Sequence, residues 1–147
     1  MNKGGTAKVF VPRDTTSRSL GADDVAQTIE ETAASRGNSI TLVRNGSRGL
    51  YWLEPLIEVE VDGVRHAYGP IAPSDVGELF DANFLSAGDH PSGLGPTEHI
   101  PYLAGQDRLT FSRVGIIDPL SLDDYQAHGG YEGLTKAVEL ECDQIVK

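Results

Sequence analysis

Cysteine is nearly absent from the chain: one residue of 147 is a cysteine, Cys142. A single thiol excludes a disulfide within the chain, and it excludes an iron–sulfur cluster that this chain alone ligates through thiolates. It also excludes a thiol oxidoreductase of the Cys-x-x-Cys type, because that chemistry needs two neighbouring cysteines. We therefore expect no redox centre built from cysteine.

Basic residues are also few, with 12 Lys and Arg against 22 Asp and Glu and a net charge of −10. They are scattered, so we expect neither nucleic acid nor an anionic membrane as a partner. No apolar run approaches the roughly 20 residues that span a bilayer. Residues 1–14 lack the apolar core of a secretory signal. These absences predict a cytoplasmic protein.

Glycine and proline, by contrast, are abundant, with 17 and 8 residues. They predict long irregular stretches and a core that is small for the chain length. The chain length suits one domain with an appendage.

The first 44 residues follow a strand–helix–strand pattern. Residues 8–11 are an apolar run that Pro12 ends, which is typical of a short strand. Residues 22–38 repeat apolar side chains at helical spacing, and residues 39–44 are again strand-like. This order predicts a right-handed crossover between parallel strands.

A hairpin is the clearest local signal in the chain. The pair Asp62-Gly63 suits a two-residue turn between strands at 57–61 and 64–68. That register places Val59 opposite His66 on one face, and Glu60 opposite Arg65 on the other. We expect the second pair to be an exposed, weak ion pair.

The second half of the chain is predicted to be a helix, a connector and further helices. Residues 72–88 carry an apolar helical stripe that can cover the hairpin, with Ser74 as a predicted N-cap. Residues 88–120 are rich in proline and glycine and read as an extended connector. A Ser-x-x-Asp pattern from Ser121 opens a helix, and a further helix is expected from residue 129. These last helices bury little on their own.

The predicted fold class is α/β. The order strand–helix–strand–strand–strand–helix favours one mixed four-stranded sheet with helices packed on it. Thioredoxin-like folds have this order, and so do other small α/β sandwiches. We divide the chain into a domain at 1–87, the connector at 88–120 and a helical lead-in at 121–147.

Common chemical sites are not predicted. The glycines of the loop at 44–55 precede a hairpin and not a helix, which argues against a phosphate loop. The four histidines match no zinc spacing, and Cys142 has no basic neighbour that would form a thiolate. Adjacent acidic pairs such as Asp23-Asp24 suit helix N-termini. The sequence therefore predicts no catalytic, cofactor-binding or metal-ligating residue.

Two long segments resemble a known family. "VRNGSRGLYWLEP" (43–55) and "IDPLSLDDYQAHGGYEGL" (117–134) are similar to the N-terminal part of the beta, or diaphorase, subunit of soluble NAD-dependent formate dehydrogenases. That subunit is similar to the flavin-binding subunit of respiratory complex I. The resemblance implies that FMN, NAD and iron–sulfur clusters belong to a further part of the subunit or to partner subunits, and that this chain holds none.

The resemblance also implies a thioredoxin-like two-iron ferredoxin fold. Such ferredoxins hold their cluster partly through a Cys-x-Gly-x-Cys pattern in the loop after the second strand. Here Ser47, Gly49 and Tyr51 occupy that pattern, so only its glycine is kept. We interpret the scaffold as one without its cluster.

The loop is therefore predicted to be a docking surface. Arginine and aromatic side chains are enriched in protein interfaces. The alternative is that the aromatic residues pack under the sheet while the arginines stay in solvent. The predicted docking residues are Arg44, Asn45, Gly46, Ser47, Arg48, Gly49, Tyr51 and Trp52.

These inferences predict an assembly domain that is not an enzyme on its own but part of an NAD-linked oxidoreductase. Its expected partners are other subunits of the dehydrogenase complex and the flavin domain of its own parent chain. The alternative function is a stand-alone thioredoxin-like module that binds a protein or a peptide.

Overall fold

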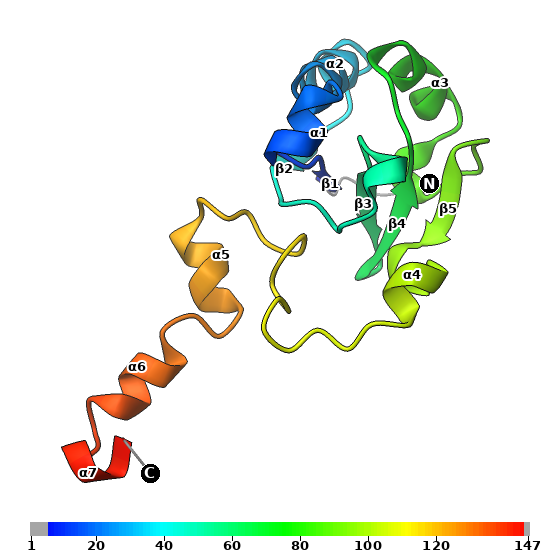
Figure 1. The fold of residues 1–147 in the computed structure, drawn as a ribbon. Coiled ribbons are helices and arrows are strands. Elements are labelled where there is room, and N and C mark those ends of the chain that lie inside the picture. The colour runs from blue at the N-terminus through cyan, green and yellow to red at the C-terminus, as the bar shows by residue number, and fades with distance from the viewer. Residues whose placement is uncertain (1–5, 146–147) are drawn as a thin grey trace.

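A five-stranded mixed sheet forms the centre of the protein, a computed structural model of which describes residues 6–145 (Figure 1). The strand order is β2-β1-β3-β4-β5; β1 and β2 are parallel, and the other neighbours are antiparallel. The strands are β1 (Ala7–Phe10), β2 (Ile40–Val43), β3 (Ile57–Val61), β4 (Val64–Tyr68) and β5 (Gly93–Pro96). The ends of the predicted ranges, 1–5 and 146–147, lie outside the described residues.

The predicted crossover between the first two strands is confirmed. The helices α1 (Thr15–Ser19) and α2 (Ala22–Ser35) connect β1 to β2. The Asp14 side chain begins α1 by accepting hydrogen bonds from the backbone N–H groups of Thr16 and Ser17. In the parallel register Val9 lies opposite Leu42.

The predicted hairpin is confirmed in its register. Val59 lies opposite His66, and Val61 lies opposite Val64. Asp62 and Gly63 have φ values of 50° and 78°. A two-residue turn whose twist matches the strands needs positive φ at both positions, which Asp-Gly tolerates.

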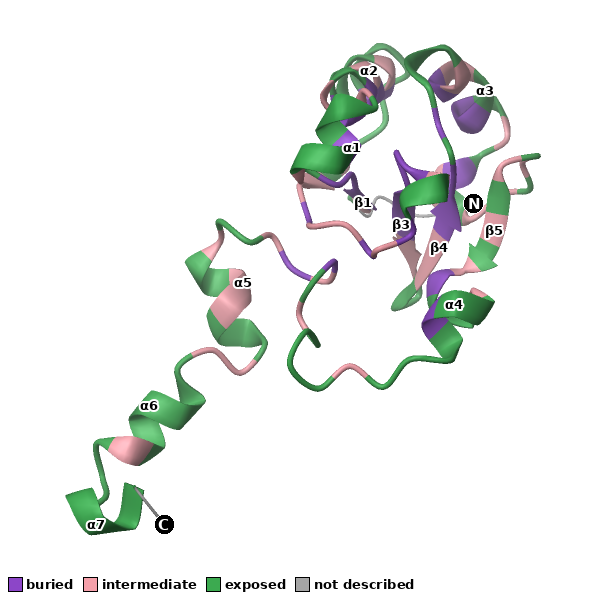
Figure 2. Cartoon of the chain, viewed as in Figure 1, coloured by how far each residue is buried: buried purple, intermediate pink, exposed green. Residues whose placement is uncertain are grey.

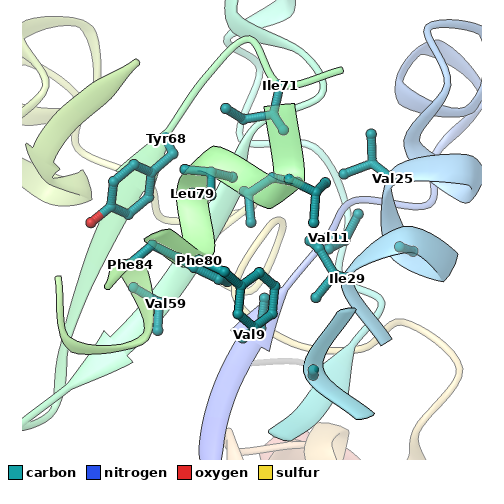
Figure 3. Packing of buried hydrophobic residues seen from close by; sticks show 14 of the residues in the cluster. Val9, Val11, Val25, Ile29, Val59, Tyr68, Ile71, Leu79, Phe80 and Phe84 are labelled. Atoms are coloured by element: carbon teal, nitrogen blue, oxygen red, sulfur yellow. The ribbon is translucent and has the colours of Figure 1, made fainter. Parts of the chain in front are cut away.

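The main hydrophobic core lies between the sheet and helices α2 and α3 (Val76–Asp81) (Figure 3). Ile29 of α2 and Leu79 of α3 are fully buried in it. Phe84, from the 3-10 helix η3 (Phe84–Ser86), packs edge-to-face on Phe80 and Tyr68, with ring centroids 5.0 and 6.0 Å apart. Burial of this apolar surface is the main favourable contribution to folding.

The second predicted helix differs from the expectation at both ends. Ser74 is not its N-cap; the 3-10 helix η2 (Pro73–Asp75) precedes α3, and the Asp75 carboxylate accepts a 2.8 Å hydrogen bond from the Ala72 N–H. At the other end Asn83 adopts a left-handed φ of 57°, which ends α3 before η3 begins. The apolar stripe stays buried because the turn returns Phe84 to the core.

The sheet has five strands and not the predicted four. The fifth, β5, lies in the segment expected to be an extended connector, and it pairs with β4 so that Ala67 lies opposite Gly95. Proline and glycine are compatible with this strand because it is short and lies at an edge. The 3-10 helix η4 (Thr97–His99) and helix α4 (Pro101–Ala104) follow it. The predicted α/β class is otherwise confirmed.

The C-terminal part is helical and largely exposed (Figure 2). The Ser121 hydroxyl accepts a 3.1 Å hydrogen bond from the Asp124 N–H, which confirms the predicted cap of α5 (Leu122–Ala127). The single helix predicted from residue 129 is instead two, α6 (Glu132–Ala137) and α7 (Cys142–Ile145). Within residues 6–145 no helix is long and apolar enough to cross a bilayer.

Truncation of Phe84 tests this description of the core. Phe84→Ala should lower the free energy of unfolding by about 3–5 kcal/mol, because it removes a fully buried ring and leaves a cavity. Urea unfolding followed by circular dichroism measures the change. Leu20→Ala, at a side chain 52% exposed, should cost less than about 0.5 kcal/mol. Equal losses in the two variants would contradict the assignment of the core.

Candidate functional site

The loop between β2 and β3 lies on the face of the sheet opposite the main core. Side chains alternate along a strand, so Glu58, between the core residues Ile57 and Val59, points to this second face. Leu50 of the loop packs there in a second apolar cluster. The other buried members of that cluster are Leu56, Ala67 and Leu103.

A buried contact between Glu58 and Arg65 occupies the centre of this face. Glu58 is 1% exposed, and its carboxylate lies 3.5 Å from the Arg65 guanidinium. The Arg65 guanidinium also lies 3.5 Å from the centre of the Phe10 ring. The predicted exposed pair between Glu60 and Arg65 is therefore wrong: the register is as expected, but Arg65 turns inward because Phe10 and Glu58 attract it.

Residues 106–117, here called the covering segment, close part of this face. The Gly115 carbonyl accepts hydrogen bonds from Asn45 (2.8 Å) and from Arg65 (3.1 Å), and the Ile116 carbonyl accepts a second one from Arg65 (2.6 Å). Gly115 has a φ of 79°, and a Cβ at this position would lie 2.5 Å from Cδ of Arg48. Only glycine fits this close approach.

Arg48 is buried beside the contact between Glu58 and Arg65, with 3% of its surface exposed. One of its terminal nitrogens, Nη2, donates to the Glu98 carboxylate of η4. Its Nε and Nη1 atoms have no hydrogen-bond partner among residues 6–145. A guanidinium buried in this way is a strong donor for any acceptor that reaches it.

Five of the eight predicted docking residues fall into two groups. Asn45 and Arg48 are buried, and Arg44 is half-buried in an ion pair with Asp23. Tyr51 and Trp52 are 58% and 61% exposed. The alternative prediction was that the aromatic side chains pack under the sheet while the arginines stay in solvent. The structure shows the opposite, with exposed aromatic side chains and buried or half-buried arginines.

The remaining three docking residues shape the loop. The Ser47 hydroxyl donates to the Glu54 carboxylate (2.7 Å) and accepts from the Gly49 N–H (2.9 Å). Gly49 has a left-handed φ of 82°. Gly46 lies against the backbone of Gly115. Ser47, Gly49 and Gly46 therefore stand in the loop because its backbone conformation requires them.

Several functional residues of this face lie far along the chain and are not predicted by the sequence. Glu98 and Gly115 contact the loop, as does Arg108, which donates to the Arg48 carbonyl (2.8 Å). Tyr102 of α4 packs edge-to-face on Trp52, with ring centroids 5.2 Å apart. The sequence offers one signal for these contacts: Tyr102 and Leu103 are apolar residues in a proline-rich segment, so they need a protein surface on which to pack.

A cavity of about 550 Å³ lies between the loop and the covering segment. Ser47, Gly49 and Tyr51 line it on one side. Leu109 and Phe111 line the other side and are largely exposed. The cavity therefore combines polar loop atoms with an apolar wall.

Burial controls the acidity of the central carboxylates. Loss of water raises the pKa of Glu58, and the nearby Arg48 and Arg65 offset part of this rise. Burial also raises the pKa of Glu54, although hydrogen bonds from the Leu56 N–H and from Ser47 oppose it. Desolvation lowers the pKa of Arg65, and the nearby Glu58 carboxylate raises it in part.

The raised pKa of Glu58 predicts a pH-dependent stability. The folded state keeps the Glu58 proton above pH 4.5, where an unfolded glutamate has lost it, so this contribution to stability falls as the pH rises through that window. Glu58→Gln should remove the loss. The unfolding free energy of the variant relative to the wild type should therefore rise as the pH increases above 4.5. Glu30→Gln, at an exposed position of α2, is the control. Identical slopes in E58Q and the wild type would refute the prediction.

A substitution at Gly115 tests the close approach of the covering segment. Gly115→Ala should cost about 1–3 kcal/mol of stability, because alanine is strained at positive φ and its Cβ meets Arg48 and the Ser47 carbonyl. Hydrogen exchange should show faster exchange in residues 106–117 than in the hairpin. Gly77→Ala, whose added Cβ meets nothing within 4 Å, should leave exchange in that segment unchanged. Unchanged exchange in G115A would mean that the segment is not held through this glycine.

Comparisons with solved structures identify the fold. The chain is similar to a thioredoxin-like [2Fe-2S] ferredoxin from Aquifex aeolicus, with 19% identity, a TM-score of 0.51, and coverage of 64% of this chain and 94% of the ferredoxin. A second structure of the wild-type ferredoxin from that organism has 21% identity, a TM-score of 0.46 and coverage of 65% and 94%. No protein-family model and no curated protein matches the sequence.

The comparison contradicts the prediction that this chain holds no cofactor and that FMN, NAD and iron–sulfur clusters belong only to a further part of the subunit or to partner subunits. The similar solved structure with a TM-score of 0.51 is named for a two-iron, two-sulfur cluster. The expectation rested on the number of cysteines. That number limits the ligands available for a cluster, but it does not show whether the fold is one found in cluster-binding proteins.

The described residues do not fit a thiolate-ligated cluster at the loop. Ser47 is hydrogen-bonded to Glu54, Tyr51 points its ring into solvent, and Cys142 lies exposed in α7. Among residues 6–145 no three histidine, cysteine or acidic side chains are grouped so as to hold a metal ion. The chain thus has the thioredoxin-like ferredoxin fold, and its loop at residues 44–55 contains no cysteine.

Proposed function

We propose that the chain is a docking domain of an electron-transfer oxidoreductase. The observation that carries the proposal is the exposed pair of Trp52 and Tyr102, which stands on a thioredoxin-like ferredoxin fold. The partner would be another subunit of the same complex, bound over these two rings.

The geometry of the aromatic pair supports a contact role. Trp52 is 61% and Tyr102 is 48% exposed, although each could bury a large apolar area. The two rings come from η1 (Tyr51–Leu53) and α4, which lie 50 residues apart in sequence and are fixed by the same apolar cluster. Rigid aromatic anchors of this kind dominate the binding energy of many interfaces.

The exposed C-terminal part extends the apolar surface. Between residues 109 and 145 many large apolar side chains lie in solvent, and α5, α6 and α7 extend away from the sheet (Figure 1). Soluble monomers rarely leave this much apolar surface uncovered. The most exposed are Leu109, Phe111, Leu120, Leu134 and Val138.

The more specific proposal comes from the sequence resemblance at residues 43–55 and 117–134. It is that the parent complex is a cytoplasmic NAD-linked formate dehydrogenase, in which the whole complex transfers electrons from formate to NAD. In this view the chain is not an enzyme on its own. Its partners would be the other subunits and the flavin domain of its parent chain.

A second candidate is a stand-alone binding module for a protein or a peptide. The 550 Å³ cavity beside the loop favours it, because an extended peptide could place an apolar side chain against Leu109 and Phe111. The two proposals differ in the partner: an oxidoreductase subunit in the first, an unrelated protein in the second.

Purification from the native host tests the docking proposal. The chain should co-purify with subunits of a formate-oxidising, NAD-reducing complex. Trp52→Ala combined with Tyr102→Ala should weaken this association at least about tenfold, since each ring is expected to be an interface anchor. Quantitative mass spectrometry of the co-purified subunits measures the change.

The control is Leu20→Ala, which removes an exposed apolar side chain from the α1 end of the molecule. Circular dichroism should show native folding for all variants, because none of the three residues is buried. A folded double variant that retains all its subunits would refute the docking surface. A chain that co-purifies with no oxidoreductase subunit would refute the proposed complex.

A further inference from the structure

A small cavity of about 180 Å³ lies between the loop, η4 and the covering segment. It has the volume of about six liquid waters, which is enough for a small polyatomic ion. Its polar lining is dominated by donors from segments far apart in sequence. They are Arg48, Gln106, Arg108 and Ser112, with the Glu98 carboxylate as the one acidic group.

Arg48 is the buried residue among the polar side chains that line this cavity. It is 3% exposed, and its Nε and Nη1 atoms have no hydrogen-bond partner among residues 6–145. Leaving such donors without an acceptor costs free energy, so the site is suited to a ligand that supplies one. Each of these two N–H donors can make one charge-assisted hydrogen bond to an oxygen of a carboxylate or a phosphate.

Arg108 adds a second positive charge. It donates from Nε to the Gln106 side-chain oxygen (2.7 Å) and from Nη2 to the Arg48 carbonyl (2.8 Å). These acceptors are neutral, and within the described part of the chain Arg108 has no acidic partner closer than 4 Å. Because Gln106 accepts through its oxygen, its amide N–H₂ group is available to donate.

The neighbouring acids do not cancel these charges. Glu98 pairs with Arg48 through Nη2 alone, and its side chain is 66% exposed. Glu58 does not line the cavity, and its carboxylate lies 3.5 Å from the Arg65 guanidinium. Two guanidinium groups and one largely exposed carboxylate therefore line the cavity.

We propose that this cavity binds a small oxyanion, held by Arg48 and Arg108. The shared chemistry is a charged group with two or more oxygens, such as a free phosphate or the carboxylate of a small acid. A cation is disfavoured because the lining offers donors, and a neutral ligand would leave the guanidinium charges uncompensated. The inference is independent of the docking proposal, since it concerns buried side chains and not the exposed rings.

Binding of inorganic phosphate and of acetate to the purified chain tests this proposal. Each anion is titrated at constant ionic strength, with chloride as the replacement salt, because screening alone changes surface charges. The wild type should bind at least one of them saturably, with Kd on the order of 1 mM or tighter. NMR should show a shift of the Arg48 Nε–H signal that follows the same curve. Phosphate and acetate distinguish a tetrahedral from a planar ligand.

Variants assign the binding to the two arginines. Arg48→Gln and Arg108→Gln should each weaken it at least about tenfold, since each removes a charge-assisted contact. Arg36→Gln is the matched control, because Arg36 is paired with Asp81 on the far side of the fold. If R48Q does not fold, R108Q and the Arg48 signal of the wild type decide. Absence of saturable binding of both anions, or equal affinity in R108Q, would overturn the proposal.

Discussion

The Gly115 carbonyl holds the second face of the sheet together. It accepts hydrogen bonds from Asn45 and Arg65, and so connects the β2–β3 loop, the hairpin and the covering segment at one atom. These bonds compensate two polar side chains that would otherwise be buried at a cost. The loop conformation, the position of Arg48 and the inward turn of Arg65 all depend on the segment lying where this carbonyl reaches them.

This arrangement separates the two kinds of side chain that the loop contains. The Arg48 side chain lies inside, where Nη2 donates to Glu98, whereas the aromatic side chains Tyr51 and Trp52 are exposed. The proposed anion site uses the inside of the loop, and the proposed protein contact uses the outside. The two roles use different atoms, although one loop contains both sets of side chains.

The fold class, the parallel crossover and the hairpin register could be predicted because each depends on local signals. The Asp62-Gly63 turn sets its register through two adjacent residues, and α2 follows from apolar spacing within one segment. The edge strand β5 could not be predicted, because its glycines and proline give no strand signal. It is defined only by its pairing with β4. The environment of Arg48 was equally hidden, since its contacts come from residues 98, 108 and 115.

The sequence by itself determined the order of elements from β1 to β4, the scarcity of thiol ligands and the left-handed turn at Asp62-Gly63. Only the tertiary structure decided which loop residues are accessible and which are buried. The physical reason is that exposure of a side chain is set by what packs on it, and here the packing segment follows about 60 residues later in the chain. Composition names the side chains available for chemistry, while long-range packing selects which of them meet a ligand or a partner.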